Sequence, residues 1–228
     1  MSVADASVAE RIESHFRAVG VAAAPRQIAQ LASYFGLLTK WNKTVNLTAL
    51  DLDLPNPGTL DRLFVEPFLA AAAIRKVHEA GAGASGPSTR LLDVGSGGGS
   101  PAIPLAIALE QTSGLRMVES RGRKAAFLRE VIRQLPLDGA EVFAERLEAL
   151  VDRPGLSESV DLVSIRAVRA DRDLWKSLAY LVRPGGFVLW FRTAADANTD
   201  PVFFPHFLLH SVEALVPPDS ELGVLRRT

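Results

Sequence analysis

Apolar side chains recur at helical spacing through the first 80 residues of the chain. One set follows Pro25, a residue that suits the first turn of a helix. Its members are Ile28, Leu31, Phe35 and Leu38. A second apolar segment extends from Leu60 to Val77, after a stretch that contains two prolines. We therefore predict that the N-terminal part of the protein is helical.

The segment from Glu79 to Ser88, EAGAGASGPS, has the composition of a flexible linker. We place a domain boundary there. Residues 1–88 then form a helical region with its linker, and residues 89–228 form a second domain.

Beyond the linker, short β-like runs alternate with helix-like runs. The predicted strands are Arg90–Val94, Leu115–Glu119, Glu141–Ala144, Val160–Ile165 and Phe187–Arg192, and the tail can supply two more at Phe203–Val212 and Leu222–Arg226. The predicted helices are Pro101–Glu110, Arg123–Leu135 and Asp171–Leu181. Alternation of this kind is typical of an α/β fold, with a mostly parallel sheet and helices on both faces.

The stretch LLDVGSGGGSPAIPLAI, Leu91 to Ile107, places a glycine-rich loop between a strand and a helix. A phosphate-binding P-loop needs a lysine directly after its last glycine, and the first lysine after this loop is Lys124. A dinucleotide loop, G-x-G-x-x-G, fits at Gly95 and Gly97, but its third glycine position is Ser100. Neither pattern matches well.

A third pattern, an acidic strand end followed by G-x-G-x-G, fits better. Its residues are Asp93, Gly95, Gly97 and Gly99. Glycines there let the backbone approach S-adenosylmethionine closely. The second strand ends in Glu119, whose carboxylate can accept hydrogen bonds from both ribose hydroxyls. We predict an S-adenosylmethionine site on a Rossmann-like fold of the class I methyltransferase type, with a dinucleotide site as the alternative.

Composition narrows the classes of protein further. The chain has no cysteine, which excludes disulfides, thiolate metal sites and cysteine nucleophiles. Its four histidines form no metal-binding pattern, so we expect no metal. The N-terminus does not resemble a secretory signal, and no apolar run is long enough to span a bilayer. We expect a cytoplasmic protein without membrane contact.

Five motifs, in order along the chain, carry a resemblance to a known family. They are LLTKWNKTVNLTAL (Leu37–Leu50), the glycine-rich stretch, MVESRGRKAAFL (Met117–Leu128), ERLEAL (Glu145–Leu150) and DLVSIRAV (Asp161–Val168). On these motifs the chain resembles the glucose-inhibited division protein B family, the bacterial 16S rRNA guanine-N7 methyltransferases.

The resemblance implies a function and a set of site residues. The function is transfer of a methyl group from S-adenosylmethionine to guanine N7, with 16S rRNA or the small ribosomal subunit as the partner. Separately from the resemblance, we expect a monomer. Gly95 and Ser100 would contact the cofactor, and Leu147 and Glu148 would lie at its adenine. Arg166 would lie at the cofactor and orient the target base. The residues alone leave a structural ion pair open for Arg166.

A basic segment between Arg116 and Arg133 is the candidate RNA surface. It holds six basic residues against two acids, while the whole chain has a net charge of −1. The segment is either a solvated helix face or a stripe that faces phosphates. Arg123 and Lys124 are the candidate RNA contacts.

The chain departs from the family pattern at four places. Ser100, Pro101 and Ala102 replace an aromatic or aliphatic residue followed by proline and glycine. Leu63 and Glu66 replace a histidine and an aspartate, and Arg192 and Thr193 replace a lysine–glycine pair. The basic C-terminal strand is reduced to ELGVLRRT. Several departures fall where RNA is expected, so it stays open whether they abolish RNA activity.

The predicted chemistry needs no general base. Guanine N7 carries a lone pair and no proton, so the enzyme must align the nucleophile with the methyl group. Two other functions stay open at this point. One is a methyltransferase that acts on a small molecule or a protein, and the other is a non-catalytic relative that binds the cofactor.

Overall fold

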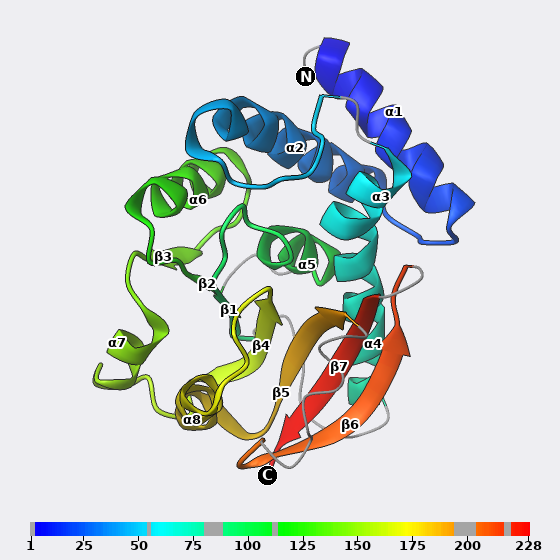
Figure 1. Ribbon diagram of the computed structural model, residues 1–228. Helices are drawn as coiled ribbons and strands as arrows, with labels where there is room; N and C mark the ends of the chain where they lie inside the picture. The colour runs from blue at the N-terminus through cyan, green and yellow to red at the C-terminus, as the bar shows by residue number, and fades with distance from the viewer. Residues whose placement is uncertain (1–2, 54–55, 80–88, 111–113, 194–203, 217–219) are drawn as a thin grey trace.

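A seven-stranded sheet runs through the structure in the order β3-β2-β1-β4-β5-β7-β6 (Figure 1). The computed structural model describes residues 3–53, 56–79, 89–110, 114–193, 204–216 and 220–228. The strands are β1 (Leu91–Val94), β2 (Leu115–Val118), β3 (Glu141–Phe143), β4 (Val160–Arg166), β5 (Val182–Thr193), β6 (Phe207–Ala214) and β7 (Ser220–Arg227). Strands β1 to β5 are parallel, and β7 is antiparallel to both β5 and β6. The predicted α/β fold is confirmed.

Helices fill the N-terminal region and the connections between strands. They are α1 (Val3–Ala18), α2 (Pro25–Val45), α3 (Pro57–Leu60), the π-helical turn η1 (Asp61–Val65), α4 (Glu66–Glu79), α5 (Ala102–Ala108), α6 (Gly122–Gln134), α7 (Leu147–Val151) and α8 (Arg172–Leu181). None of the helices in the described part of the chain is long and apolar enough to cross a membrane.

Three elements differ from the sequence-based expectation. β5 begins at Val182 rather than Phe187, because Val182 pairs with Val160 before the chain bulges out and pairs again from Phe187. β6 begins at Phe207 rather than at the predicted Phe203, because Pro205 has no N–H to offer a neighbouring strand and the residues before Phe207 form a turn. Phe203 itself lies outside the described residues. The short helix α7 was not predicted.

Side chains of the strands alternate between two apolar layers. In β5, Phe187 and Leu189 belong to the layer under α2, α4, α5 and α6, whereas Val188 and Trp190 belong to the layer under α7 and α8. This period of two is what a sheet covered by helices on both faces requires. Because the carboxyl ends of β1, β2 and β4 meet at one edge, the loops that follow them lie together there.

The predicted domain boundary lies at the end of a linker that falls mostly outside the described residues. Among the described residues, one apolar layer continues across that boundary and joins α1, α2 and α4 to α5, α6 and the sheet. Trp41 of α2 packs against the fully buried Phe127 of α6, with ring centroids 5.8 Å apart. Trp41 is therefore a packing residue. The N-terminal helices share the core of the sheet.

A shared core predicts a single unfolding transition. We expect Phe127→Ala to lower the free energy of unfolding by about 3–5 kcal/mol, the usual cost of truncating a buried aromatic residue, while the transition stays two-state. Calorimetry measures both properties. Arg129→Ala, on the exposed side of the same helix, is the control and should change little. Two separate transitions would contradict a shared core.

Candidate functional site

Two cavities lie on either side of the glycine loop at the carboxyl edge of the sheet. One, of about 270 Å³, is lined by Gly95, Glu119, Leu147 and Glu148 among others. The other, of about 250 Å³, is lined by Gly98, Ser100 and Arg166 together with residues of α2 and of the loop that follows it. The structure therefore divides the predicted site residues between two adjoining spaces.

The backbone of the loop can be formed because glycines occupy its left-handed positions. Gly95 has φ +73°, and a Cβ at this residue would lie 2.6 Å from Val168 Cγ1. Gly97 has φ +52°, and its N–H donates to Glu119 Oε2 at 2.9 Å. Side chains at such positions are strained. The loop is thus held in place by the carboxylate at the end of β2.

Glu119 has a structural role that the sequence did not predict. Its Oε1 accepts from the backbone N–H of Arg121 at 2.8 Å, while Oε2 accepts from Gly97. Each carboxylate oxygen has two lone pairs, so both keep one for a further donor. The predicted ribose contact is compatible with this geometry and stays a prediction.

Leu147 and Glu148 come from α7, the helix that follows β3. Leu147 is buried and Glu148 is exposed, and both line the same cavity as Glu119. This neighbourhood suits the predicted adenine contact, because an apolar side chain can pack against the base while the carboxylate stays hydrated.

Asp93 lies beneath the loop, 1% exposed. Its Oδ1 accepts from the hydroxyl of Ser164 at 2.5 Å, but its Oδ2 has no hydrogen-bond partner. Burial raises the pKa of Asp93 to about 6. The hydrogen bonds from Ser164 and Ser96 and the charge of Arg166 act in the opposite direction and lower this pKa. A buried carboxylate with a free oxygen is an acceptor that lacks its donor.

Arg166 ends β4 with its guanidinium buried. Nη2 lies 2.5 Å from Glu66 Oε2 of α4, and the guanidinium carbon lies 4.3 Å from the centre of the Phe191 ring. Burial lowers the pKa of Arg166 to about 10, while the charge of Glu66 acts in the opposite direction. The structural ion pair that the sequence left open is therefore present, and Arg166 also lines the second cavity.

A π-helical turn supplies the remaining partner of Arg166. In a regular α-helix the N–H of Glu66 would donate to the carbonyl of Arg62, but here it donates to the carbonyl of Asp61. The next residue, Pro67, has no N–H to donate in its place. The carbonyl of Arg62 is therefore left without a helical hydrogen bond. That carbonyl instead accepts from Arg166 Nη1 at 2.7 Å. The Ser100 hydroxyl donates to the next carbonyl, that of Leu63, at 3.1 Å. η1 thus connects the loop to Arg166.

Tyr34 is a site residue that sequence reasoning missed. It is fully buried, and its hydroxyl donates to Gly98 O in the glycine loop at 2.5 Å. Burial raises the pKa of Tyr34 above its ordinary value, so it stays a neutral donor. Its place in the apolar repeat of α2 was a usable signal, since Tyr34 is the one polar aromatic residue among the buried positions of that helix.

The side chain of Asn42 ties the loop after α2 to the end of the helix. Asn42 Oδ1 accepts from the N–H groups of Leu47 and Thr48, whereas Asn46 ends the helix in the left-handed region at φ +54°. The Thr48 hydroxyl accepts from the N–H of Leu50 and adds a second side-chain hydrogen bond within the loop. This loop forms one wall of the second cavity.

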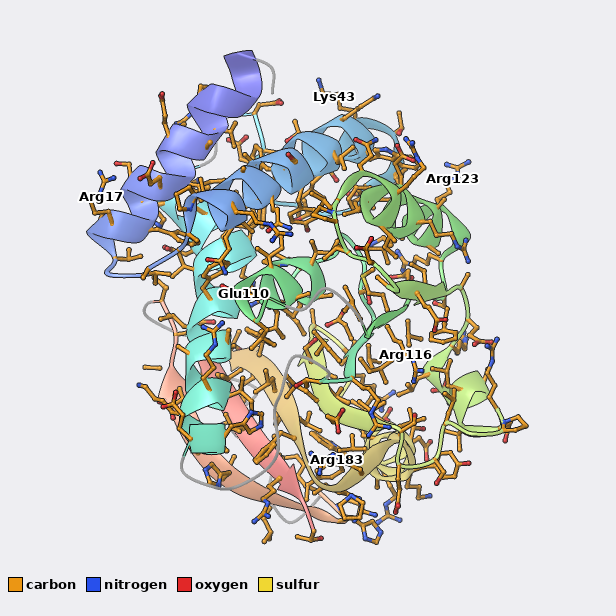
Figure 2. The ribbon with its side chains drawn as sticks, turned by 180° about the vertical axis from the view of Figure 1, so that it is seen from behind. Arg17, Lys43, Glu110, Arg116, Arg123 and Arg183 are labelled. Carbon is orange, nitrogen blue, oxygen red and sulfur yellow. The ribbon has the colours of Figure 1, made fainter. Side chains whose placement is uncertain are left out.

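Arg123 and Lys124, the predicted RNA contacts, lie at the start of α6 but differ in surroundings. Arg123 is exposed, and Figure 2 shows it on the same side of the molecule as Lys43 of α2. A Cβ on Gly97 would lie 4.0 Å from Lys124 Nζ, so this ammonium group reaches the glycine loop. Arg123 faces solvent, whereas Lys124 lies beside the predicted cofactor site.

The site fits a cationic amino-acid cofactor with a nucleoside. Asp93 Oδ2 beneath the loop and Arg166 Nε beside the second cavity are buried without partners. The carboxylate oxygen of Asp93 could accept a hydrogen bond from the ammonium group of a ligand, and the N–H at Arg166 Nε could donate one to a ligand oxygen. Among the described residues, no cluster of histidine and acidic side chains suited to a metal ion is present.

The family model for "rRNA small subunit methyltransferase G" matches residues 27–200 of this chain. The chain belongs to this family. A relative of that name from Cupriavidus necator is 38% identical over 184 residues, which cover 80% of this chain and 75% of the relative. One from Stenotrophomonas maltophilia is 36% identical, covering 81% and 76%.

Solved structures share the fold of this member of the methyltransferase G family. An O-methyltransferase from Bacillus cereus matches with a TM-score of 0.58 and 18% identity, covering 86% of this chain and 91% of that one. A geranyl diphosphate C-methyltransferase from Streptomyces coelicolor matches with a TM-score of 0.51 and 15% identity, covering 71% and 83%. The predicted resemblance and the class I methyltransferase fold are confirmed. The chain is a methyltransferase with S-adenosylmethionine as its cofactor, which excludes the alternative of a dinucleotide site.

The buried carboxylate predicts proton-linked cofactor binding. The ammonium group of the cofactor should favour the charged form of Asp93, so binding near pH 6 should release a proton and tighten as the pH rises through that value. Calorimetry with S-adenosylhomocysteine, in two buffers of different ionisation enthalpy, measures the release. Asp93→Asn should bind without it. Equal release by the variant would place the titrating group elsewhere.

Loss of charge at Glu119 should weaken cofactor binding specifically. We expect Glu119→Gln to reduce affinity by roughly 1–3 kcal/mol, because the loop N–H of Gly97 and the ribose hydroxyls would lose a charged acceptor. Glu141→Gln on the neighbouring strand β3, where the side chain is exposed and paired with Arg116, is the control. An unchanged cofactor affinity, with weakened RNA binding instead, would show that Glu119 contacts RNA.

Proposed function

We propose that this protein transfers a methyl group from S-adenosylmethionine to N7 of a guanine in 16S rRNA, as a cytoplasmic monomer that acts on the RNA or on the small ribosomal subunit. The observation that carries the proposal is the buried, charged Arg166 in a cavity that offers no general base: Tyr34, which also lines it, is held neutral by burial and donates to Gly98 O. The described residues that line this cavity include no histidine, aspartate or glutamate, and the chain has no cysteine. Membership of the methyltransferase G family supports rRNA as the substrate.

The two cavities suggest how the ligands divide. The adenosine part would occupy the space beside Glu119, Leu147 and Glu148. The methionine part and the target base would share the space between Ser100 and Arg166. When bound, S-adenosylmethionine supplies an electrophilic methyl group on a sulfonium.

The role of Arg166 follows from what guanine presents. The O6 and N7 atoms of guanine are adjacent acceptors that arginine recognises well. N7 must keep its lone pair for the reaction, so the guanidinium would donate to O6 and leave N7 directed at the methyl group. The positive charge would also disfavour protonation of N7. Alignment of this kind is the source of the expected rate gain, because no proton has to be removed.

The departures from the family pattern are compatible with this function. Glu66 retains a carboxylate next to Arg166. Arg192 retains a cation, although its Nη2 pairs with Glu221 Oε2 at 3.3 Å and its side chain is largely buried. Leu63 lines the cavity as an apolar residue. The aspartate and lysine positions of the family thus keep their charge in this chain.

The absence of a base predicts a flat pH profile. We expect the single-turnover rate, with saturating cofactor and small subunits that lack the modification, to change little from about pH 7 to about pH 9, since Arg166 stays charged there. Arg166→Ala should lower the rate by about 100-fold or more without a new pH dependence. Methyl label in protein rather than RNA, or an ionisation near neutrality removed by one substitution, would mean a different target. Cofactor binding without any turnover would indicate a non-catalytic relative.

A further inference from the structure

The side chain of Arg166 belongs to a chain of polar contacts that reaches the C-terminal strand. Its Nη2 contacts Glu66 Oε2 at 2.5 Å. The other oxygen, Oε1, accepts from the hydroxyl of Ser220 at 2.7 Å. Ser220 is the first residue of β7 and pairs in register with Thr193, the last residue of β5. The contacts thus join three elements that are far apart in the sequence.

These contacts constrain Glu66 in a way that the ion pair alone would not. A carboxylate can rotate about its last bond and present either oxygen to a cation. With Oε1 bonded to Ser220, Oε2 is directed toward Arg166. Glu66 is 3% exposed, so water cannot easily replace the serine hydroxyl. A second cation, Arg62 Nη1, lies 3.5 Å from Oε2 and is more exposed than Arg166.

The cost of this arrangement argues for a role beyond folding. A buried ion pair loses hydration on both partners and is often replaceable by apolar residues without loss of stability. Here it leaves Arg166 Nε buried and unpartnered, although the side chain lies against Phe191. A purely structural arginine would be expected to use that donor. The geometry leaves one donor of the guanidinium without a partner while it fixes the direction of the others.

We propose that Glu66 and Ser220 are positioning residues for methyl transfer: Ser220 orients the Glu66 carboxylate, and Glu66 holds the Arg166 guanidinium toward the target base. This inference rests on the proposed function. Strand β7 contributes no residue to either cavity beside the glycine loop. Through Ser220, it would nevertheless help to set the geometry of the site.

The test compares Ser220→Ala with a matched control, Ser177→Ala. Ser220 is partly buried, and Ser177 of α8 is buried; like Ser220, Ser177 donates its hydroxyl to an oxygen, here the backbone carbonyl of Asp173, at a place far from the glycine loop. We expect Ser220→Ala to lower the single-turnover rate about three- to tenfold, the range for one lost hydrogen bond, with cofactor affinity and melting temperature like those of Ser177→Ala. Glu66→Gln should lower the rate further. A rate for Ser220→Ala equal to that of the control would overturn the proposal.

A second measurement is independent of activity. In ¹⁵N NMR of the arginine side chains, we expect Arg166 of the wild type to show hindered rotation about the guanidinium and slow exchange of its N–H protons. Both should accelerate in Ser220→Ala and not in Ser177→Ala. Unchanged Arg166 signals in Ser220→Ala would overturn the inference even if the enzyme is active. If the wild type transfers no methyl group to rRNA, the proposed function fails, and the NMR result still decides whether Ser220 orders Arg166.

Discussion

A buried positive charge is the constraint on which the site depends. The Arg166 guanidinium lies away from water, and an unpaired charge there would be strongly destabilising. Three groups compensate the charge of the guanidinium. They are the carboxylate of Glu66, the carbonyl of Arg62 in a π-helical turn and the face of the Phe191 ring. Because Glu66 and Arg62 both belong to the N-terminal helices, those helices must dock on the sheet before the site is complete. The shared apolar core provides that docking.

The glycine loop lies between Arg166 and the cavity in which we expect the adenosine part of the cofactor. Ser100 lies within reach of Arg166 Nη1 at 3.3 Å, Gly98 O accepts from Tyr34, and the N–H of Gly97 donates to Glu119. One loop is thereby held by a residue of α2, by the end of β2 and by the arginine that ends β4.

Local patterns were sufficient to predict most of the fold and the loop. Glycines at fixed spacing after a strand predict left-handed turns, and Glu119 was found because the end of the next parallel strand must lie beside that loop. The contacts of Tyr34, Glu66 and Ser220 could not be predicted in this way, since they join positions 64, 100 and 154 residues apart. Ser220 in particular has no local signature. The helix α7 was missed because its five residues are too few for a helical repeat to be recognised.

In the proposed reaction, N7 of guanine attacks the methyl group after alignment by Arg166 and without a general base. Mass spectrometry of the nucleosides from 16S rRNA tests this after incubation of unmodified small subunits with the protein and isotope-labelled S-adenosylmethionine. We expect the label in 7-methylguanosine, and Arg166→Ala should greatly reduce it. Label on an exocyclic amine or a ribose hydroxyl would rule out the proposed reaction, because those targets must lose a proton, and label on another base would rule out guanine as the target.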